Sequence, residues 1–286
     1  VVKYTVTNFS STSSLSPAIR GVNATNSVTG TTNSGTVFTA NGTYTDTLTA
    51  TADGTHLMYA DGNTGSYTIS DFEIVSHSSS GFVETWYDQS GNSEDAVQET
   101  AGNQPKIVSA GSVLSGLDFD GSTSSRTLVA SSVSGLTGSL SMFSTSVRDS
   151  GSGNPVSISN STNNAKYFAV KEGGTTSVAN PRNSTNVSVS ASVSGADRLT
   201  FAVTTGETSF GVGALGGTLV TSTSDYGSDF DSGNLDQIAI GLLRTASPTG
   251  FFDGRINEIL VYTSDQTANR GAVETNIANH YNITLV

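Results

Sequence analysis

The stretch Trp86-Tyr87-Asp88-Gln89-Ser90-Gly91-Asn92 holds the only tryptophan of this 286-residue chain. The apolar run 82–87 is typical of a strand, and it leads into a polar turn that ends in Gly91-Asn92. Loops at the rim of a rigid sheet often carry recognition. We therefore expect this turn to sit at a sheet rim and to take part in binding.

Short segments in which apolar and polar residues alternate recur on both sides of this stretch, as in 117–120, 187–193 and 199–203. A two-residue period is typical of half-buried strands, and a spacing of roughly ten residues with Gly-rich turns indicates a sandwich or barrel. The nearly all-apolar stretch 238–243 is expected to be buried on both faces. Residues 204–235 are rich in Gly, Ser, Thr and Asp, and we expect them to form long surface loops.

One helix is expected near the end of the chain, over 266–280. Val273, Ile277 and Tyr281 recur every four residues and give the segment one apolar stripe. Ser264 is the expected N-cap residue of this helix.

A small polar segment, 76–81, divides the chain into two expected domains, 1–78 and 79–286. In the first domain the parity of the apolar residues changes between 67–69 and 72–74, which predicts a bulge near Ser70-Asp71. The dipeptides Asn41-Gly42 and Asp53-Gly54 predict tight hairpins. The chain begins at Val1 without Met, so we expect it to be a processed product or a piece of a longer protein.

Composition narrows the class of protein. The formal net charge is -12, from 24 acidic and 12 basic residues, and no basic face is evident that could neutralise the phosphates of a nucleic-acid duplex. No apolar run approaches the roughly 20 residues that span a bilayer. The chain has no cysteine, which excludes disulfides and thiolate sites and favours a bacterial or viral source for an extracellular protein of this size.

Four segments together resemble the concanavalin A-like (laminin-G-like) jelly-roll domains. They are Thr85-Trp86-Tyr87-Asp88-Gln89-Ser90-Gly91-Asn92, Asn103-Gln104-Pro105-Lys106-Ile107, Leu117-Asp118-Phe119-Asp120-Gly121-Ser122 and the stretch 252–262 followed by the helix. Residues 1–76 resemble a small carbohydrate-binding β-sandwich, through Asn41-Gly42-Thr43-Tyr44 and 67–74. The resemblance implies an all-β fold: a jelly-roll sandwich with one C-terminal helix, preceded by a smaller β-sandwich.

The same resemblance implies a function, because such domains are common in phage tail and virion-surface proteins and in bacterial secreted proteins. It favours a virion-surface or tail-associated protein, or a related surface adhesin, that binds glycans through a lectin-like jelly roll. Expected partners are glycans and other subunits of the surface structure, with homo-oligomerisation left open. A purely structural or capsid-decoration module and a glycoside hydrolase of the same fold are the alternatives, because this fold hosts all three.

The candidate ligand-binding residues are Trp86, Tyr87, Asp88, Asn92 and Tyr226. The rings of Trp86 and Tyr87 could stack on a sugar, or they could anchor a core strand. Asp88, Gln89, Ser90 and Asn92 could hydrogen-bond a sugar. Alternatively they form a rigid turn in which Asp88 accepts hydrogen bonds from backbone N–H groups and Asn92 tolerates a positive φ.

Calcium is the one cofactor that the sequence suggests. Asp225, Asp229 and Asp231, with Asp236 nearby, cluster in sequence, and calcium takes six to eight oxygen ligands. The alternative is a solvated acidic loop. His56, His77 and His280 are far apart in sequence and predict no metal site.

A glycosidase needs two carboxylates that flank the scissile bond. The nearest acidic pairs are Asp118/Asp120, Asp71/Glu73 and Asp229/Asp231. The Glu-x-Asp-x-(x)-Glu strand of the β-glucanases of this fold is absent. The sequence therefore favours binding without catalysis, and no catalytic residue is assigned.

Overall fold

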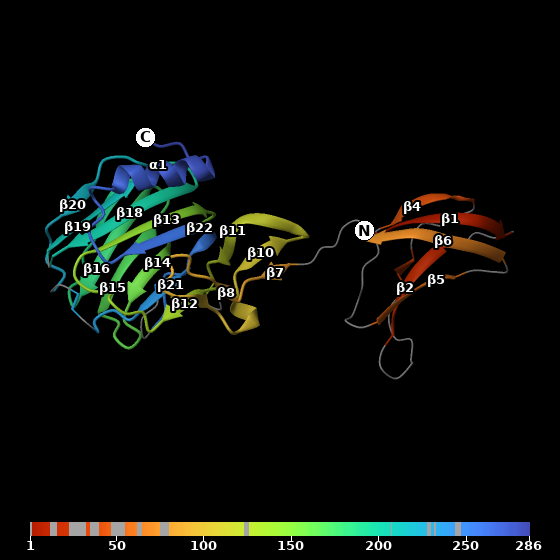
Figure 1. Ribbon diagram of the computed structural model, residues 1–286, viewed down its shortest axis with the longest axis horizontal. Helices are drawn as coiled ribbons and strands as arrows, with labels where there is room; N and C mark the ends of the chain where they lie inside the picture. Colours follow the sequence, from red (N-terminus) through yellow and green to blue (C-terminus); the bar gives the residue numbers. More distant parts are fainter. Residues whose placement is uncertain are drawn as a thin grey trace. The chain divides into compact units, whose positions relative to one another are not determined.

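The computed structural model describes residues 2–11, 16–22, 33–34, 40–46, 55–61, 65–74, 80–122, 126–206, 208–227, 230–231, 233–243 and 247–286. The chain forms two compact units, Val1–Ser79 and Ser80–Val286. The first unit is coloured red to orange in Figure 1, and the second runs from yellow to blue.

The first unit contains two three-stranded antiparallel sheets, in the orders β4-β1-β6 and β3-β2-β5. On β1, Tyr4 and Val6 are fully buried, as the two-residue alternation of this segment requires. The ring of Tyr4 stacks on that of Tyr44 with the centroids 5.9 Å apart. The strands are β1 Val2–Ser11, β2 Ser16–Val22, β3 Asn33–Ser34, β4 Gly42–Asp46, β5 Thr55–Asp61 and β6 Gly65–Ile74.

The bulge predicted near Ser70-Asp71 is confirmed. The register of β6 against β1 shifts between Lys3 and Thr5, and Asp71 has φ 51°. One extra residue on β6 explains why the apolar parity changes along this strand.

The hairpin predicted at Asn41-Gly42 is wrong. Neither Asn41 nor Gly42 has the positive φ that such a turn needs, and Gly42 begins β4, which pairs with β1. The Asn41 side chain instead accepts a hydrogen bond from the Phe9 N–H, with N and Oδ1 2.8 Å apart. The second predicted hairpin, Asp53-Gly54, lies outside the described residues.

The second unit is a sandwich of two eight-stranded antiparallel sheets, which confirms the predicted all-β fold with one C-terminal helix (Figure 1). We call them the first and the second sheet. In spatial order, the first sheet consists of β20 Val220–Ser222, β19 Ser209–Ala214, β18 Asp197–Thr205, β13 Leu140–Arg148, β22 Asp253–Tyr262, β11 Ser112–Asp120, β10 Lys106–Ser109 and β7 Gly81–Phe82. The second sheet consists of β17 Val189–Ser192, β16 Thr176–Asn183, β15 Lys166–Glu172, β14 Gly153–Ser159, β21 Gln237–Ile240, β12 Leu128–Ser131, β9 Ala96–Val97 and β8 Thr85–Trp86.

Two of the segments that carry the family resemblance pair directly with each other, because β11 and β22 are neighbours. Leu117 lies opposite Ile256, and Phe119 lies opposite Gly254. The ring of Phe119 packs beside Gly241, where an added Cβ would come within 2.3 Å of it and φ is +83°. Most of stretch 238–243 is buried, since β21 lies between β12 and β14.

The helix α1, Arg270–Tyr281, begins later than the sequence predicts. Its N-cap residue is Asn269, and Ser264 is not the cap: the Ser264 hydroxyl oxygen instead accepts a hydrogen bond from the Gln266 side-chain amide at 2.7 Å. The predicted apolar stripe is correct, since Ile277 is buried and Val273 and Tyr281 pack against the core. Within the part of the chain that the structure describes, no helix combines the length and apolar character of a membrane span.

The prediction of long surface loops over 204–235 is wrong for much of that range, which contains β19 and β20. The glycines of this range weaken the strand pattern in the sequence, although β19 pairs with β18 along its whole length and with β20 at 210–212. At Gly213 an added Cβ would lie 2.2 Å from the guanidinium of Arg270. The glycine therefore makes room for a helix side chain to lie against the sheet.

Candidate functional site

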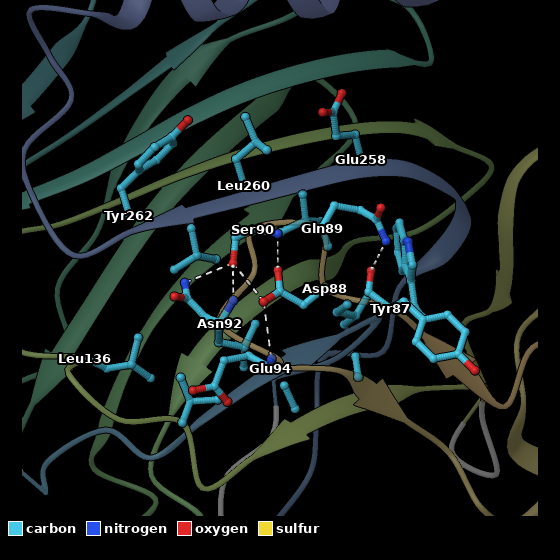
Figure 2. Close-up of a pocket in the computed structure, with 18 of the residues that line it drawn as sticks. Tyr87, Asp88, Gln89, Ser90, Asn92, Glu94, Leu136, Glu258, Leu260 and Tyr262 are labelled. Carbon is cyan, nitrogen blue, oxygen red and sulfur yellow. Dashed lines mark hydrogen bonds between the residues drawn. The ribbon is translucent and has the colours of Figure 1, made fainter.

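The turn after Trp86 is held by the carboxylate of Asp88. It accepts hydrogen bonds from the Ser90 N–H at 2.8 Å, the Ser90 hydroxyl at 2.7 Å and the Glu94 N–H at 3.2 Å (Figure 2). The Asp88 N–H in turn donates to Asp95 Oδ1 at 2.8 Å. Hydrogen bonds from Ser90 lower the pKa of Asp88, so its carboxylate is ionised across the physiological pH range.

Asn92 closes the same turn with its side-chain amide, which donates to the Ser90 hydroxyl oxygen at 2.9 Å. The positive φ angles of the turn belong to the neighbours of Asn92, Gly91 at 89° and Ser93 at 62°, and not to Asn92 itself. The alternative of a rigid turn capped by Asp88 is what the structure contains. The turn thus presents a fixed set of polar groups.

This turn borders a cleft of about 810 Å³. A volume in this range suits a small organic ligand or a short oligosaccharide. The turn forms one wall, β22 forms the second, and the second sheet supplies the apolar floor. The described lining residues are Trp86, Tyr87, Asp88, Gln89, Ser90, Asn92, Glu94, Ala96, Ala130, Val133, Ser134, Gly135, Leu136, Ile238, Ile240, Asn257, Glu258, Ile259, Leu260, Val261, Tyr262, Thr263 and Tyr281.

The wall at β22 is an open strand edge. Pairing with β11 ends at Ile256, while 258–262 remain paired with β13 on the other side. Within the described part of the chain no strand pairs with the β11 side of 257–262. Unpaired backbone N–H and C=O groups at such an edge can hydrogen-bond a ligand.

Aromatic rings lie at the turn and at the strand wall of the cleft. Trp86 is half-buried and packs against the core, so it both anchors the sheet and lines the cleft. Tyr87 is 66% exposed, and Figure 2 shows it at the opposite end of the turn from Asn92. An exposed ring at a cleft rim is the arrangement that stacks on a sugar face.

Four of the five predicted ligand-binding residues therefore line one cleft, and the fifth does not. Tyr226 is fully buried between the rings of Phe210 and Phe230, at centroid distances of 6.2 and 5.5 Å. Its hydroxyl donates to the Gly206 carbonyl. Tyr226 is a core residue, and the prediction that it contacts a ligand is wrong.

The sequence did not single out the residues of the facing wall. Glu258, Leu260 and Tyr262 project in the same direction from β22 (Figure 2). Their shared parity in the stretch 256–262 was a usable signal that they lie on one face. These three side chains also line a smaller hollow with α1. Nothing in the sequence indicated that β22 lies across the cleft from a turn some 170 residues earlier, because contacts between distant strands leave no local pattern.

The predicted calcium residues do not form a site among the described residues. Asp225 accepts a hydrogen bond from the Gly227 N–H at 2.7 Å, and Asp231 is exposed. Asp229 lies outside the described residues. Within the described ranges no three His, Asp or Glu side chains gather as metal ligands would, and the calcium site stays a prediction.

The acidic pair Asp118/Asp120 lies outside the cleft. Arg126 bonds Asp118 at 2.8 Å and approaches Asp120 at 3.7 Å, and Lys106 lies 3.8 Å from Asp118. The pair is thus part of a charge cluster on β11. Asp71 lies in the first unit, where it accepts a hydrogen bond from Ser70 at 3.1 Å.

No protein-family model matches the chain, and no curated protein matches it. Solved structures do match. IT-sialidase CBM40 of Ruminococcus gnavus bound to α2,3-sialyllactose is 16% identical with a TM-score of 0.42, over 48% of this chain and 83% of that one. The leech intramolecular trans-sialidase is 17% identical with a TM-score of 0.38, over 49% and 23%. NanB sialidase of Streptococcus pneumoniae is 14% identical with a TM-score of 0.38, over 47% and 23%. All three are distant likenesses.

Proposed function

We propose that the second unit is a glycan-binding module and that the cleft between the Trp86–Asn92 turn and β22 receives the sugar. The observation that carries the proposal is the cleft itself: about 810 Å³, with aromatic rings, an apolar floor and a rigid polar turn in one cavity. The fold alone does not decide the function, because jelly-roll sandwiches serve many roles. The residues of the cleft are the specific support.

The chemistry of a sugar matches this lining. A pyranose has an apolar C–H face, which stacks on an aromatic ring, and a rim of hydroxyl donors. Tyr87 supplies an exposed ring, and Gln89 and Asn92 supply amide groups beside it. Carboxylates of Glu94 and Glu258 can accept hydrogen bonds from hydroxyls, and charge-assisted bonds of this kind are strong.

We propose binding without cleavage. A glycosidase needs a general acid whose pKa is raised. The carboxylate of Asp88 has the opposite character, since three hydrogen bonds hold it in the turn and its pKa is lowered. Asp88 is therefore a structural anchor of the site.

We further propose that the protein acts at a virion, phage-tail or cell surface, with glycans and neighbouring surface subunits as its partners. The support is compositional: a chain without cysteine, with a net charge of -12 and only 13% charged residues. The jelly-roll resemblance also implies this surface location.

Replacing Tyr87 with alanine is expected to weaken glycan binding about tenfold or more, because the variant loses the exposed stacking ring. An aromatic contact contributes roughly 1 kcal/mol beyond its buried area, and 1.4 kcal/mol is a factor of ten. The measurement is calorimetric titration with the tightest ligand found on a broad glycan array. Reducing-sugar release is measured in parallel and is expected to be absent.

The matched control is Phe82→Ala. Phe82 is 47% exposed and does not line the cleft, so its loss is expected to leave the affinity unchanged. Equal weakening by both substitutions, or no effect of Tyr87→Ala on a ligand that binds the wild type, would contradict the proposed site.

A further inference from the structure

We propose that the cleft selects glycans without negative charge and excludes sialylated, sulfated and uronic-acid-containing ones. This inference rests on the proposed function and adds the class of ligand. It follows from the charges that line the cleft and from how the structure fixes them.

The charged groups of the cleft all have one sign. Asp88, Glu94 and Glu258 line it, and its described lining contains no Lys, Arg or His. An acidic sugar inside the cleft would therefore meet carboxylates and no compensating cation. Proteins that hold a carboxylate or sulfate ligand normally present Arg, Lys or a cluster of backbone N–H groups to it.

The structure shows the surroundings of two of these three carboxylates, those of Asp88 and Glu258. Asp88 is locked by the hydrogen bonds of the turn, and these favour its ionised form. Glu258 lies near the Tyr281 hydroxyl. The pKa of Tyr281 is raised by burial first and by the negative charge of Glu258 second, so the field of this carboxylate reaches a second lining residue.

One basic side chain lies nearby. A smaller hollow of about 320 Å³ shares Glu258, Leu260, Tyr262 and Tyr281 with the cleft and adds His280. The His280 ring contacts the Tyr281 ring edge-on, with centroids 4.6 Å apart. His280 does not line the cleft itself, so the charged side chains among the described lining residues remain carboxylates alone.

The size of the expected discrimination follows from Coulomb's law. A ligand charge about 6 Å from one carboxylate, in a surface cleft of intermediate effective dielectric, loses about tenfold in affinity. Neutral sugars gain instead, because their hydroxyls donate to the same carboxylates. Free amino groups, as in a de-N-acetylated amino sugar, add attraction. The net charge of -12 reinforces this preference at long range.

The test is a glycan array of matched pairs, in which each neutral oligosaccharide stands beside its sialylated and its sulfated form, followed by titration of the best pair at pH 7.5. We expect the wild type to bind the neutral member at least tenfold more tightly than either charged member. Glu258→Gln is expected to lower this ratio of neutral-glycan affinity to charged-glycan affinity severalfold. The control Glu99→Gln makes the same change in net charge at an exposed residue outside the cleft and is expected to leave the ratio unchanged.

The outcomes separate the two proposals. Equal or tighter binding of a sialylated or sulfated member overturns the charge selection, and if Tyr87→Ala abolishes that binding the proposed function still stands. A ratio that changes equally in Glu258→Gln and Glu99→Gln overturns the assignment to the cleft. A wild type that binds no glycan of the array removes the proposed function and the selectivity with it.

Discussion

Replacing Arg270 with methionine is expected to lower the free energy of unfolding of the second unit by about 3–5 kcal/mol. Arg270 is the first residue of α1, and its Nε donates to Glu274 Oε1 at 2.9 Å. Its Nη2 donates to the Gly217 carbonyl at 2.7 Å, and its guanidinium lies 5.5 Å from the ring centroid of Phe201. The side chain thus docks the helix on the outer face of the first sheet.

The cost arises mainly from the partner that the substitution leaves behind. Glu274 is 2% exposed, and burial raises its pKa while Arg270 opposes that rise. Without Arg270 the carboxylate stays buried and unpaired. A buried ion pair that loses one member is strongly destabilised, whereas an apolar replacement of both members is often tolerated.

The double variant Arg270→Met/Glu274→Met is therefore expected to recover most of the lost stability. Urea unfolding is followed by the fluorescence of Trp86, the single tryptophan, which lies in the second unit and reports on that unit alone. A double variant as unstable as the single one would contradict the pairing argument. So would a single variant within 1 kcal/mol of the wild type.

Replacing Glu172 with glutamine is expected to stabilise the second unit by up to about 3 kcal/mol at pH 8 and to change little at pH 4.5. Glu172 is fully buried on β15. Its carboxylate accepts a hydrogen bond from the Ser146 hydroxyl, which lies 3.0 Å from Oε1 and 2.9 Å from Oε2. Burial raises the pKa of Glu172 from 4.5 to about 7, and the hydrogen bond and the charges of Arg198 and Arg148 offset part of that rise. A difference of about 2.5 pKa units corresponds to about 3 kcal/mol.

The direction in which stability changes with pH follows from proton linkage. Between pH 4.5 and 7 the folded state keeps the proton on Glu172 and the unfolded state has lost it. The contribution of the raised pKa is therefore complete below pH 4.5 and is lost as the pH rises through 7. The wild type is expected to lose stability across this window, and the glutamine variant is expected to lose much less.

The control for this experiment is Glu99→Gln, an exposed change of the same kind. It separates the titration of Glu172 from the general effect of a net charge of -12, which also favours lower pH. Parallel stability-versus-pH curves for the wild type and Glu172→Gln, measured by urea unfolding, would contradict the role assigned to this buried carboxylate.

Local patterns predicted much of the fold because alternation and capping are short-range signals. The alternating pair Leu117/Phe119 lies in a strand, the stripe of Val273 and Ile277 lies on a helix, and the bulge at Asp71 appears as a parity change. The start of α1 was misplaced because Ser264 resembles a cap in sequence while its hydroxyl bonds Gln266. β19 was missed because Gly213, which a strand pattern penalises, is needed where Arg270 packs.

Only one wall of the cleft, the turn, could be predicted from the sequence, again because short-range patterns are the ones that a sequence displays. The turn from Trp86 to Asn92 is encoded locally, since the Asp88 carboxylate accepts hydrogen bonds from Ser90, two residues later in the chain. The facing wall depends on which strand lies across the sandwich, and sequence spacing does not report that. Tyr226 was misassigned because polar neighbours suggested a loop, whereas its ring completes an aromatic stack in the core with Phe230.

The most direct test of the central claim, that the cleft binds the glycan, uses the indole of Trp86. It is the only tryptophan and it lines the cleft, so an ¹⁵N-labelled protein gives one indole N–H signal from this site. Titration with the best neutral glycan of the array is expected to shift that signal in a saturable way, with the midpoint that calorimetry gives. A glycan that binds by calorimetry and leaves the indole signal in place would contradict the account.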